Sequence, residues 1–333
     1  MTRIAVVGAG AWGTTLADML ARKGDTVTLW AWEREVIESI NRDHVNARFL
    51  PGAALAPGVR AMSDVGETVA GAEVVVSAAP SHVVGTVMSH ARKSLASQAL
   101  VVSVSKGLEP ERLTTLSCVL RDVLAPGTEV AVLSGPSFAQ EVYQRQPTAV
   151  VAAARNSDIA QRVQRTFATS YFRVYSHTDV AGVELAGALK NVIALATGIL
   201  EGLGLGYNTR AALITRGLAE ITRLGVALGA EPATFAGLAG MGDLILTATG
   251  PLSRNHQLGI ELGQGKPLVE ALAGRTSVAE GVNTAKAAVA LGERHGVELP
   301  IARQVTEVLF HGKAPRDAVP ALMERELKAE QWR

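Results

Sequence analysis

Short runs of apolar, often β-branched residues recur through the first half of the chain, separated by polar or helical stretches. Each run is continuously apolar rather than alternating, as strands buried on both faces of a sheet are. Helical patterns such as residues 12–24 separate most of the runs, and this alternation predicts an α/β fold with a doubly wound parallel sheet. The predicted strands are 3–8, 26–31, 73–80, 99–107 and 129–135, with 147–154 and 171–176 as candidate extensions.

The second half of the chain has a different pattern, because strand signals fade and long helical patterns take over. The predicted helices are 179–202, 208–229, 255–263, 267–273, 282–295, 300–311 and 316–329. We therefore predict a domain boundary near residue 178, with an α/β domain over 1–178 and an all-α domain over 179–333. A chain of 333 residues is long enough for two domains.

The charge balance and the single cysteine limit the classes of partner and compartment. With 32 basic and 31 acidic residues and no charged block, the chain is not expected to bind nucleic acid or an anionic membrane surface. Cys118 cannot form an internal disulfide, which fits a reducing, cytoplasmic compartment. No apolar run reaches the roughly 20 residues of a membrane span. The seven histidines lack paired metal-ligand spacing, so no metal is expected.

A glycine-rich turn, GAGAWG, ends the first predicted strand and opens the first predicted helix. Gly8 permits the tight turn, Gly10 lets the backbone approach a pyrophosphate, and Gly13 lets the helix pack on the strand. The anion then lies on free N–H groups at the helix N-terminus. Glu33 follows the second strand, where an acid binds ribose hydroxyls. The context predicts a Rossmann-type dinucleotide site, but NAD against NADP stays open, because the adjacent Arg34 attracts a 2′-phosphate that Glu33 repels.

Polar and small residues also follow two other predicted strands. In a doubly wound sheet, ligands bind beyond the carboxyl ends of the strands. Lys106 lies at such an end, and Ser134, Gly135 and Ser137 lie at the next one. The alternative for Lys106 is a solvated loop lysine, but its place at a strand end favours a functional role.

Lys190 lies in a run of small and apolar residues, ELAGALKNVIALATG. Lysine is rarely fully buried unless it is paired, and desolvation lowers its pKa toward values useful for proton transfer. On a helix, Gly187 and Ala194 lie on the same face, and we interpret their small size as clearance for a substrate. Close helix packing uses the same small residues, so the pattern alone favours catalysis only slightly.

A second polar group lies in residues 237–259, GLAGMGDLILTATGPLSRNHQLG. Asp243 follows a Gly-rich turn. The side chains that open the next helix are Ser253, Arg254 and Asn255. Guanidinium, hydroxyl, amide and free N–H groups at a helix start suit a phosphate, whereas the alternative is an ordinary N-cap with a solvated arginine. The later stretch SVAEGVNTAKA is similarly ambiguous, because Ser277 or Glu280 can simply begin a helix.

Taken in order, these motifs resemble the bacterial NAD(P)-dependent glycerol-3-phosphate dehydrogenases. The strongest match is residues 187–208, GALKNVIALATGILEGLGLGYN, which resembles that family's signature over its whole length. The other matching motifs follow in family order over nearly the whole chain and are GAGAWGTTLA, APSH, SKGLE, SGPSFAQE, GMGDLILT, SRN and AEGVNTA.

The resemblance implies a role for each matching residue. Lys190 matches the catalytic lysine, and Asp243 matches an aspartate near the reacting hydroxyl. The positions that match the junction of cofactor and substrate are Lys106, Gly135 and Ser137. The positions that match substrate contacts are Ser253, Arg254 and Asn255. The positions that match cofactor contacts are Trp12, Ala139 and Glu280, with Lys106 and Arg254 also near the cofactor.

Three departures from the family pattern stand out. Ala11 replaces a frequent serine, which removes one phosphate hydrogen bond. Trp32 and Glu33 stand where many members have basic residues, so the family's NADPH preference does not transfer directly. Ala248 replaces a frequent cysteine, with no evident chemical consequence.

The implied reaction is reversible hydride transfer between C4 of the nicotinamide of NAD(P)H and C2 of dihydroxyacetone phosphate, a triose phosphate. The product is sn-glycerol 3-phosphate, a precursor for phospholipid synthesis. Lys190 would exchange the proton, with its pKa lowered by Lys106 and by burial. Asp243 would position Lys190 or the substrate hydroxyls, and Arg254 and Asn255 would hold the phosphate. The site would lie in a closing cleft between the domains, and we expect a homodimer.

Two other functions stay open. One is a related dehydrogenase that acts on a β-hydroxy acid, which the SRN and GMGDL motifs argue against. The other is a non-catalytic protein that senses NAD(P)H, which would have no need for the set formed by Lys106, Lys190 and Asp243.

Overall fold

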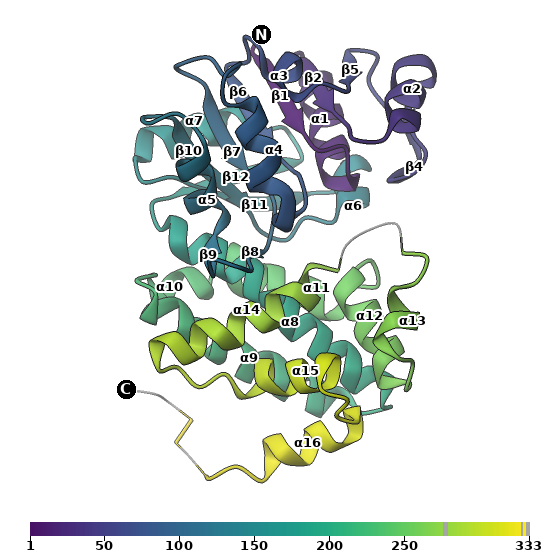
Figure 1. The fold of residues 1–333 in the computed structure, drawn as a ribbon, viewed down its shortest axis with the longest axis vertical. Helices are drawn as coiled ribbons and strands as arrows, with labels where there is room; N and C mark the ends of the chain where they lie inside the picture. The colour runs from purple at the N-terminus through teal and green to yellow at the C-terminus, as the bar shows by residue number, and fades with distance from the viewer. Residues whose placement is uncertain (276–278, 328, 331–333) are drawn as a thin grey trace.

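The computed structural model describes residues 1–275, 279–327 and 329–330. The upper half of the molecule in Figure 1 is built on a large sheet, and the lower half is helical. The sheet has eight strands in the order β12-β11-β10-β7-β6-β1-β2-β5. Their bounds are β1 Arg3–Val7, β2 Thr26–Trp30, β5 Val59–Met62, β6 Val74–Ser77, β7 Leu100–Ser103, β10 Glu129–Ser134, β11 Thr148–Ala153 and β12 Phe172–His177.

The predicted doubly wound α/β sheet is confirmed, with one difference in strand direction. Strands β1, β2, β5, β6, β7 and β10 pair in parallel, whereas β11 runs antiparallel to β10. The physical reason lies in the connection, because parallel neighbours need a crossover along one face of the sheet. The connection from β10 to β11 contains only the short helix α6 (Ala139–Tyr143), which packs against helix α1 (Ala11–Lys23) instead.

Four strands in two small hairpins and one edge strand of the main sheet were not predicted from the sequence. The edge strand is β5, and two small hairpins lie outside the main sheet. One hairpin joins β3 (Val45–Asn46) to β4 (Leu50–Ala54). The other joins β8 (Leu108–Glu109) to β9 (Thr114–Thr115) and lies at the boundary between the two halves in Figure 1. Strands of two residues are too short to produce a hydrophobic pattern.

The main sheet is covered on both faces, which explains its continuously apolar strands. Ile4 and Val6 of β1 face one layer of helices, whereas Ala5 and Val7 face the other. The first layer consists of α1, α2 (Arg34–Asp43) and α7 (Ser157–Phe167), and the second of α3 (Val65–Val69), α4 (Val84–Ala91) and α5 (Leu116–Val123).

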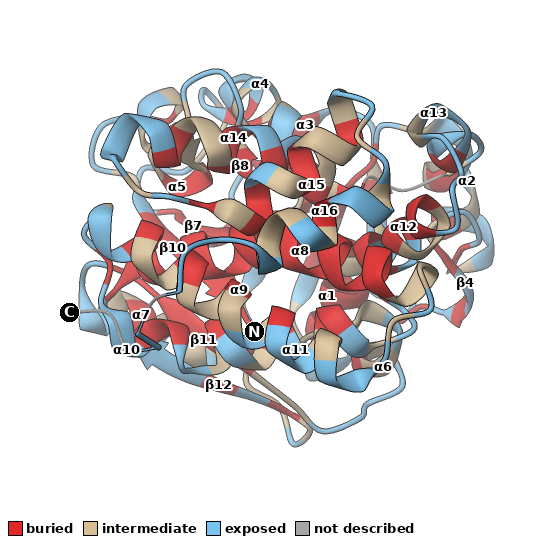
Figure 2. Ribbon diagram, turned by 90° about the horizontal axis from the view of Figure 1, so that it is seen from below, coloured by how far each residue is buried: buried red, intermediate tan, exposed pale blue. Residues whose placement is uncertain are grey.

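The helical half is organised around α8 (Val180–Gly202), which follows directly after β12. Figure 2 shows α8 as a buried helix with the other helices of this half around it. These are α9 Tyr207–Ala227, α10 Pro232–Phe235, α11 Asp243–Thr249, α12 Arg254–Gly263, α13 Leu268–Leu272, α14 Glu280–His295, α15 Pro300–Phe310 and α16 Pro315–Met323. The predicted helix over 316–329 therefore ends early, and its residue 328 lies outside the described residues.

In the described ranges, α8 is the single unbroken helix long and apolar enough to cross a membrane. The residues that pass this test are wholly buried inside the protein. A core helix shows the same combination of length, composition and burial.

Candidate active site

The glycine loop after β1 has the geometry of a phosphate cradle. Gly8 has a φ of +123°, and a Cβ there would lie 2.7 Å from the carbonyl carbon of Ala78. A Cβ on Gly13 would lie 1.9 Å from the Gly8 oxygen, so α1 can approach β1 only without that side chain. Gly10, by contrast, faces open space to 4 Å, and no side chain caps the N-terminus of α1. An open backbone at a helix N-terminus fits the pyrophosphate of a dinucleotide.

The predicted cofactor contacts Trp12 and Ala139 lie beside this loop. The Trp12 ring packs on Phe172 at a centroid distance of 6.3 Å. Ala139 begins α6, and its carbonyl accepts a hydrogen bond of 3.2 Å from Thr15 of α1. Trp12 in the first turn of α1 and Ala139 packed against α1 therefore both lie near the glycine loop.

The end of β2 offers an acid and an aromatic side chain. Glu33 is the N-cap residue of α2 and is half-buried, whereas Trp32 is 82% exposed. Arg34 pairs with Glu38 at 2.8 Å on the outer surface of α2. Glu33 and Arg34 are the two candidates for the contact with the ribose of the cofactor, and Arg34 is the one that pairs with a carboxylate.

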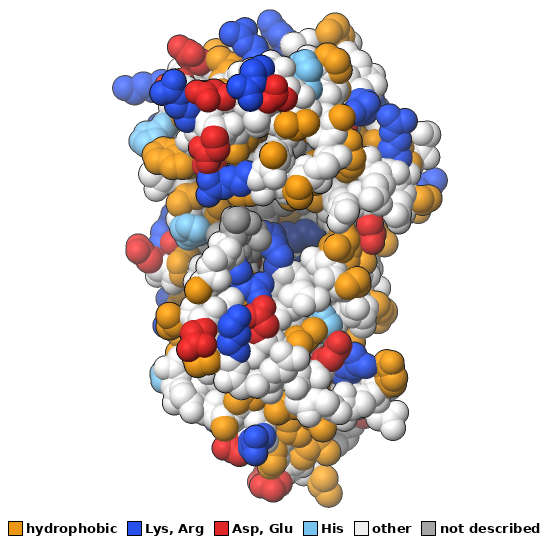
Figure 3. All heavy atoms as spheres, turned by 90° about the vertical axis from the view of Figure 1, so that its right-hand side faces the viewer, with side chains coloured by type: hydrophobic (Ala, Val, Ile, Leu, Met, Phe, Trp, Pro, Cys, Tyr) orange, Lys and Arg blue, Asp and Glu red, His pale blue; other side chains and the backbone are white. Residues whose placement is uncertain are grey.

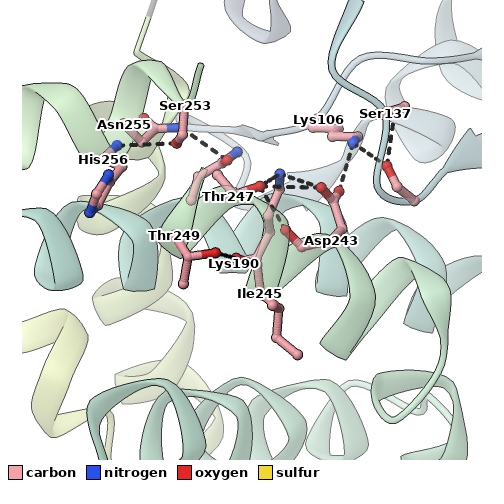
Figure 4. Close-up of polar contacts among 12 residues, drawn as sticks. Lys106, Ser137, Lys190, Asp243, Ile245, Thr247, Thr249, Ser253, Asn255 and His256 are labelled. Carbon is pink, nitrogen blue, oxygen red and sulfur yellow. Dashed lines mark hydrogen bonds and ion pairs between the residues drawn. The ribbon is translucent and has the colours of Figure 1, made fainter. Parts of the chain in front are cut away.

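Lys106, Asp243 and Lys190 meet at the boundary between the two halves. Lys190 Nζ donates to Asp243 Oδ1 at 2.7 Å, and Lys106 Nζ donates to Asp243 Oδ2 at 2.6 Å. Figure 4 shows the two ammonium groups converging on this one carboxylate. Asp243 is 1% exposed and Lys190 5% exposed, whereas the Lys106 side chain keeps 19% of its surface open. The three residues singled out from the sequence therefore form one buried ionic group.

The electrostatics of this group set its protonation. Burial lowers the pKa of Lys190 to about 8, and the charges of Lys106 and Arg254 act in the same direction, whereas Asp243 opposes them. Burial also works against ionisation of Asp243, but the two lysines outweigh it and hold the pKa of that carboxyl below its usual value. The site therefore contains a stable anion beside a lysine that can exchange a proton near neutral pH.

Thr247 belongs to the same group, although the sequence analysis missed it. Its hydroxyl accepts a hydrogen bond from Lys190 Nζ and donates to the Asp243 carbonyl at 2.7 Å. One helical turn separates Thr247 from Asp243, so both side chains face Lys190 from α11. That four-residue spacing after Asp243 was the available signal. The segment before Asp243 is a π-helical turn (Leu238–Gly242) that continues into α11, rather than the predicted simple turn.

Gly187 does not provide the substrate clearance that its size suggested. A Cβ at Gly187 would lie 2.6 Å from Ser134 Oγ and 3.8 Å from Lys106 Cγ. The space is therefore filled by the end of β10 and by the stem of Lys106. The prediction was wrong because sequence spacing shows a gap on a helix but not which distant element fills it. The glycine instead lets the sheet edge approach α8.

The other predicted residues of β10 lie close to Lys106. The Gly135 carbonyl accepts a hydrogen bond of 2.8 Å from Lys106 Nζ and one of 2.9 Å from Ser137 Oγ. Gly135 has a φ of +138°, and its Cβ would lie 3.0 Å from the Val150 backbone, so this turn requires glycine. The turn thereby places Ser137 and the Lys106 ammonium on one carbonyl oxygen.

The start of α12 combines a free cation with engaged polar groups. Ser253 caps the helix by accepting 3.2 Å from the His256 N–H. The amide of Asn255 donates to Asn191 at 3.0 Å and accepts from the Gly281 N–H at 3.0 Å, so it joins three helices. These two contacts leave one N–H of the Asn255 amide for the phosphate that the sequence predicted it to hold.

Arg254 is exposed and forms no hydrogen bond or ion pair with any part of the chain that the structure describes. Surrounding protein nevertheless desolvates its guanidinium and lowers the pKa of Arg254, with Glu280 partly opposing this effect. Exposed area together with a dense protein surround is typical of a side chain in a cleft. Figure 3 shows the surface hollowed between the two halves, with Lys and Arg side chains inside the hollow.

Glycines hold α12 against α8 and so set the distance between Arg254 and Lys190. A Cβ on Gly198 would lie 2.1 Å from the His256 oxygen. The glycines of this contact are Gly198 and Gly202 on α8 and Gly259 and Gly263 on α12, each pair one helical turn apart. Because the backbones approach this closely at both helical turns, no side chain fits between the two helices at these positions.

Glu280 begins α14, as one of the two sequence interpretations proposed, while Ser277 lies outside the described residues. The Glu280 carboxylate crosses between the halves and accepts hydrogen bonds from the N–H of Ser81 at 3.1 Å and from its hydroxyl. Ser81 begins a short 3-10 helix (Ser81–Val83) just after β6. Glu280 therefore lies at the sheet edge that carries the glycine loop.

No group of three or more His, Cys, Asp and Glu side chains within the described ranges could hold a metal ion.

Comparison with known proteins gives one consistent family. The family model described as NAD-dependent glycerol-3-phosphate dehydrogenase N-terminus matches residues 3–160, and the corresponding C-terminus model matches residues 179–320. Glycerol-3-phosphate dehydrogenase [NAD(P)+] of Geobacter sulfurreducens is 54% identical over 334 residues, covering 99% of each chain. The protein of the same name from Geobacter sp. (strain M21) is 53% identical and covers 98% of each chain.

Solved structures agree with this result. The glycerol-3-phosphate dehydrogenase of Coxiella burnetii superimposes with a TM-score of 0.94 at 38% identity, covering 97% of this chain and 99% of that one. The yeast enzyme from Saccharomyces cerevisiae has a TM-score of 0.83 at 29% identity, with coverage of 97% and 99%. The resemblance found in the motifs is thereby confirmed, and the chain belongs to the NAD-dependent glycerol-3-phosphate dehydrogenase family.

Proposed function

We propose that the chain catalyses the reversible, NAD(P)-linked interconversion of sn-glycerol 3-phosphate and dihydroxyacetone phosphate. The observation that carries this proposal is the buried group of Lys106, Asp243 and Lys190. It lies where the carboxyl edge of the sheet meets the helical half, so a dinucleotide on the glycine loop and a substrate near Arg254 can both reach it. Family membership and relatives named glycerol-3-phosphate dehydrogenase support this reaction.

The residues of the group account for the proton transfer. A nicotinamide cofactor held on the glycine loop would supply or accept the hydride at C2 of the substrate. In the reducing direction, the carbonyl oxygen at C2 becomes a hydroxyl and takes one proton, which the Lys190 ammonium donates. The Lys106 ammonium supplies a second positive charge that stabilises the developing negative charge on this oxygen. Solvent then returns a proton to Lys190, and oxidation uses the neutral amine of Lys190 as the base.

The remaining residues bind and orient. Asp243 keeps the two ammonium groups in place, and its ionised state is secured by them. Arg254 and the free N–H groups at the start of α12 hold the substrate phosphate, assisted by Ser253 and by the remaining N–H of Asn255. The residues that border this place from the sheet side are Gly135 and Ser137. Binding energy from the phosphate then orients C2 for reaction.

The same proposal assigns the two halves of the chain. Residues 1–178 form the dinucleotide-binding domain, with contacts from Gly8, Gly10, Trp12, Gly13 and Ala139 and from Glu33 or Arg34, and residues 179–333 form the substrate domain. Lys106, Arg254 and Glu280 reach the cofactor from the boundary between them. We further propose that the enzyme acts in the cytoplasm as a homodimer and supplies glycerol 3-phosphate for phospholipid synthesis.

Steady-state kinetics with dihydroxyacetone phosphate, comparing NADH with NADPH, test the proposal. A panel that includes 3-hydroxyisobutyrate and 6-phosphogluconate distinguishes the related β-hydroxy-acid dehydrogenases. Turnover confined to a β-hydroxy acid would replace the proposed substrate. Tight NADH binding without turnover of any triose phosphate would instead support a non-catalytic sensor of the reduced cofactor.

A further inference from the structure

A segment of the sheet half reaches into the helical half and carries Lys106 at its start. This segment, residues 106–117, contains the β8-β9 hairpin and is called the arm below. Leu108 in the arm is 2% exposed and belongs to the apolar core of the helical half, together with Leu185 and Leu189 of α8. The hairpin of the arm therefore packs against the helical half, whereas Leu116 at its far end belongs to the core of the sheet half.

Glu184 of α8 holds the far end of the arm. Its carboxylate accepts a hydrogen bond of 2.8 Å from the Ser117 N–H and a second one from the Ser117 hydroxyl. Ser117 lies in the first turn of α5 and is 1% exposed, and Glu184 is 8% exposed. Burial raises the pKa of Glu184, and the hydrogen bonds to Ser117 oppose this effect.

A carboxyl group at this position is costly if it only fills space. An apolar side chain of similar volume would pack between two helices without the loss of hydration that a buried acid incurs. What the carboxylate adds is direction, because two hydrogen bonds fix both the distance and the orientation of the α5 start relative to α8.

Both ends of the arm are thus attached to the same helix, α8. At one end, Lys106 binds Asp243, which also binds Lys190 of α8. At the other end, Ser117 binds Glu184, six residues before Lys190 on α8. Six residues of α-helix rise about 9 Å, so α8 acts as a rigid spacer between the two attachment points.

We propose that Glu184 is a positioning residue for the reaction: by anchoring the arm to α8, it holds Lys106 opposite Lys190. Glu184 does not touch the reacting atoms, and the inference rests on the proposed function only for its kinetic readout. If the anchor is lost, the arm loosens and Lys106 spends time away from Asp243 and Lys190.

The consequence can be measured at Lys190. The charged groups that face Lys190 are Asp243 from α11, Lys106 from the arm and Arg254 from α12. Withdrawal of Lys106 removes a positive neighbour, and this change raises the pKa of the Lys190 ammonium. A purely structural loss of stability would leave this pKa unchanged as long as the protein is folded.

Three variants separate positioning from stability. Glu184→Ala removes the anchor, whereas Glu184→Gln keeps an oxygen for the Ser117 N–H and an amide for its hydroxyl. Glu220→Ala is the matched control, because Glu220 is 2% exposed and accepts 2.9 Å hydrogen bonds from the Ile301 and Ala302 N–H groups wholly within the helical half. Both alanine variants lose a buried helix-capping carboxylate, but only one of them loosens the arm.

The pKa of Lys190 is measured in the free protein by NMR of lysine labelled with 15N, using Lys190→Met to assign the signal. The pH profile of dihydroxyacetone phosphate reduction is measured alongside. We expect Glu184→Ala to raise the pKa of Lys190, move the basic limb to higher pH and lower kcat about ten- to a hundredfold. Glu184→Gln should restore both quantities, and Glu220→Ala should lose thermal stability without changing either.

Two results would overturn the positioning role. One is a folded Glu184→Ala protein with the Lys190 pKa and kcat of the parent, and the other is an equal pKa change in Glu220→Ala. Absence of triose phosphate turnover in the parent protein would count against the proposed function alone, because the NMR titration still reports on the arm.

Discussion

Lys106 and Lys190 share a single carboxylate, with each ammonium on a different oxygen of Asp243. The two lysines come from opposite halves of the molecule, Lys106 from the end of β7 and Lys190 from the centre of α8. One buried anion thus faces two cations, and in the proposed reaction the surplus positive charge stabilises the developing alkoxide. Burial lowers the pKa of Lys190, the charge of Lys106 acts in the same direction, and the Lys190 proton is therefore exchangeable near neutral pH.

The pH dependence follows from this charge balance. The pKa of Lys190 is about 8, so the ammonium predominates below pH 8 and the amine above it. Reduction of dihydroxyacetone phosphate needs the ammonium, so its kcat/KM should fall as pH rises through about 8. Oxidation of glycerol 3-phosphate needs the amine, so its kcat/KM should rise over the same interval. Measuring kcat/KM against pH in both directions checks this prediction. If kcat/KM changes in the same sense with pH in both directions, Lys190 does not transfer the proton.

Arg254→Ala should weaken the binding of phosphorylated substrates in particular. A charge-assisted contact to a phosphate contributes about 1.5–3 kcal/mol, which corresponds to a loss of about ten- to a hundredfold in kcat/KM for dihydroxyacetone phosphate. Unphosphorylated dihydroxyacetone should lose much less. Arg303→Ala, which removes a surface arginine paired with Glu293, is the matched control. An equal loss for both substrates would contradict a phosphate-binding role.

Gly259→Ala should destabilise the helical half and disturb the site at the same time. Its Cβ would lie 2.3 Å from the Leu195 oxygen, so α8 and α12 must separate. Overpacking of this kind costs about 1–3 kcal/mol, and the shift moves Arg254 relative to Lys190. Thermal unfolding and KM for the triose phosphate measure the two effects. Gly58→Ala, whose Cβ would meet only a contact of 4.0 Å, should leave both unchanged.

The cofactor should be NADH rather than NADPH. Glu33 is half-buried at the N-cap of α2, whereas Arg34 lies exposed beside Glu38 on the outer face of α2, so we expect the Glu33 carboxylate to meet the ribose. An acid there binds the 2′-hydroxyl and repels a 2′-phosphate. Titration of each cofactor, monitored by tryptophan fluorescence, should give tighter binding of NADH. Glu33→Gln should reduce the difference between the dissociation constants of NADH and NADPH. Tighter NADPH binding by the parent protein would assign the ribose contact to Arg34.

The sequence predicted the site through rules that act locally along the chain. Lys106 and Ser137 were found because they follow strands, and the glycine loop because each glycine has its own steric reason. The partners of these residues come from elements far away in the sequence, and no local rule identifies them. Four contacts were missed for this reason. They are Ser134 with Gly187, Asn191 with Asn255, Glu184 with Ser117 and Glu280 with Ser81.

Strand direction after β10 was missed for a related reason. The sequence shows a strand at 147–154, but its direction depends on whether α6 crosses the sheet, and a helix of five residues leaves too weak a pattern to decide. The long helices were predicted closely because each carries a full apolar face over several turns.

The most direct test of the whole account compares Lys190→Ala with the parent protein in the reduction of dihydroxyacetone phosphate by NADH, together with NADH binding. The Lys190 ammonium donates hydrogen bonds to Asp243 and Thr247, and Lys190 lies on the helical half, away from the glycine loop. We predict that the variant binds NADH as the parent does and has no measurable turnover. Substantial turnover in a variant that still binds NADH would contradict the central role of Lys190.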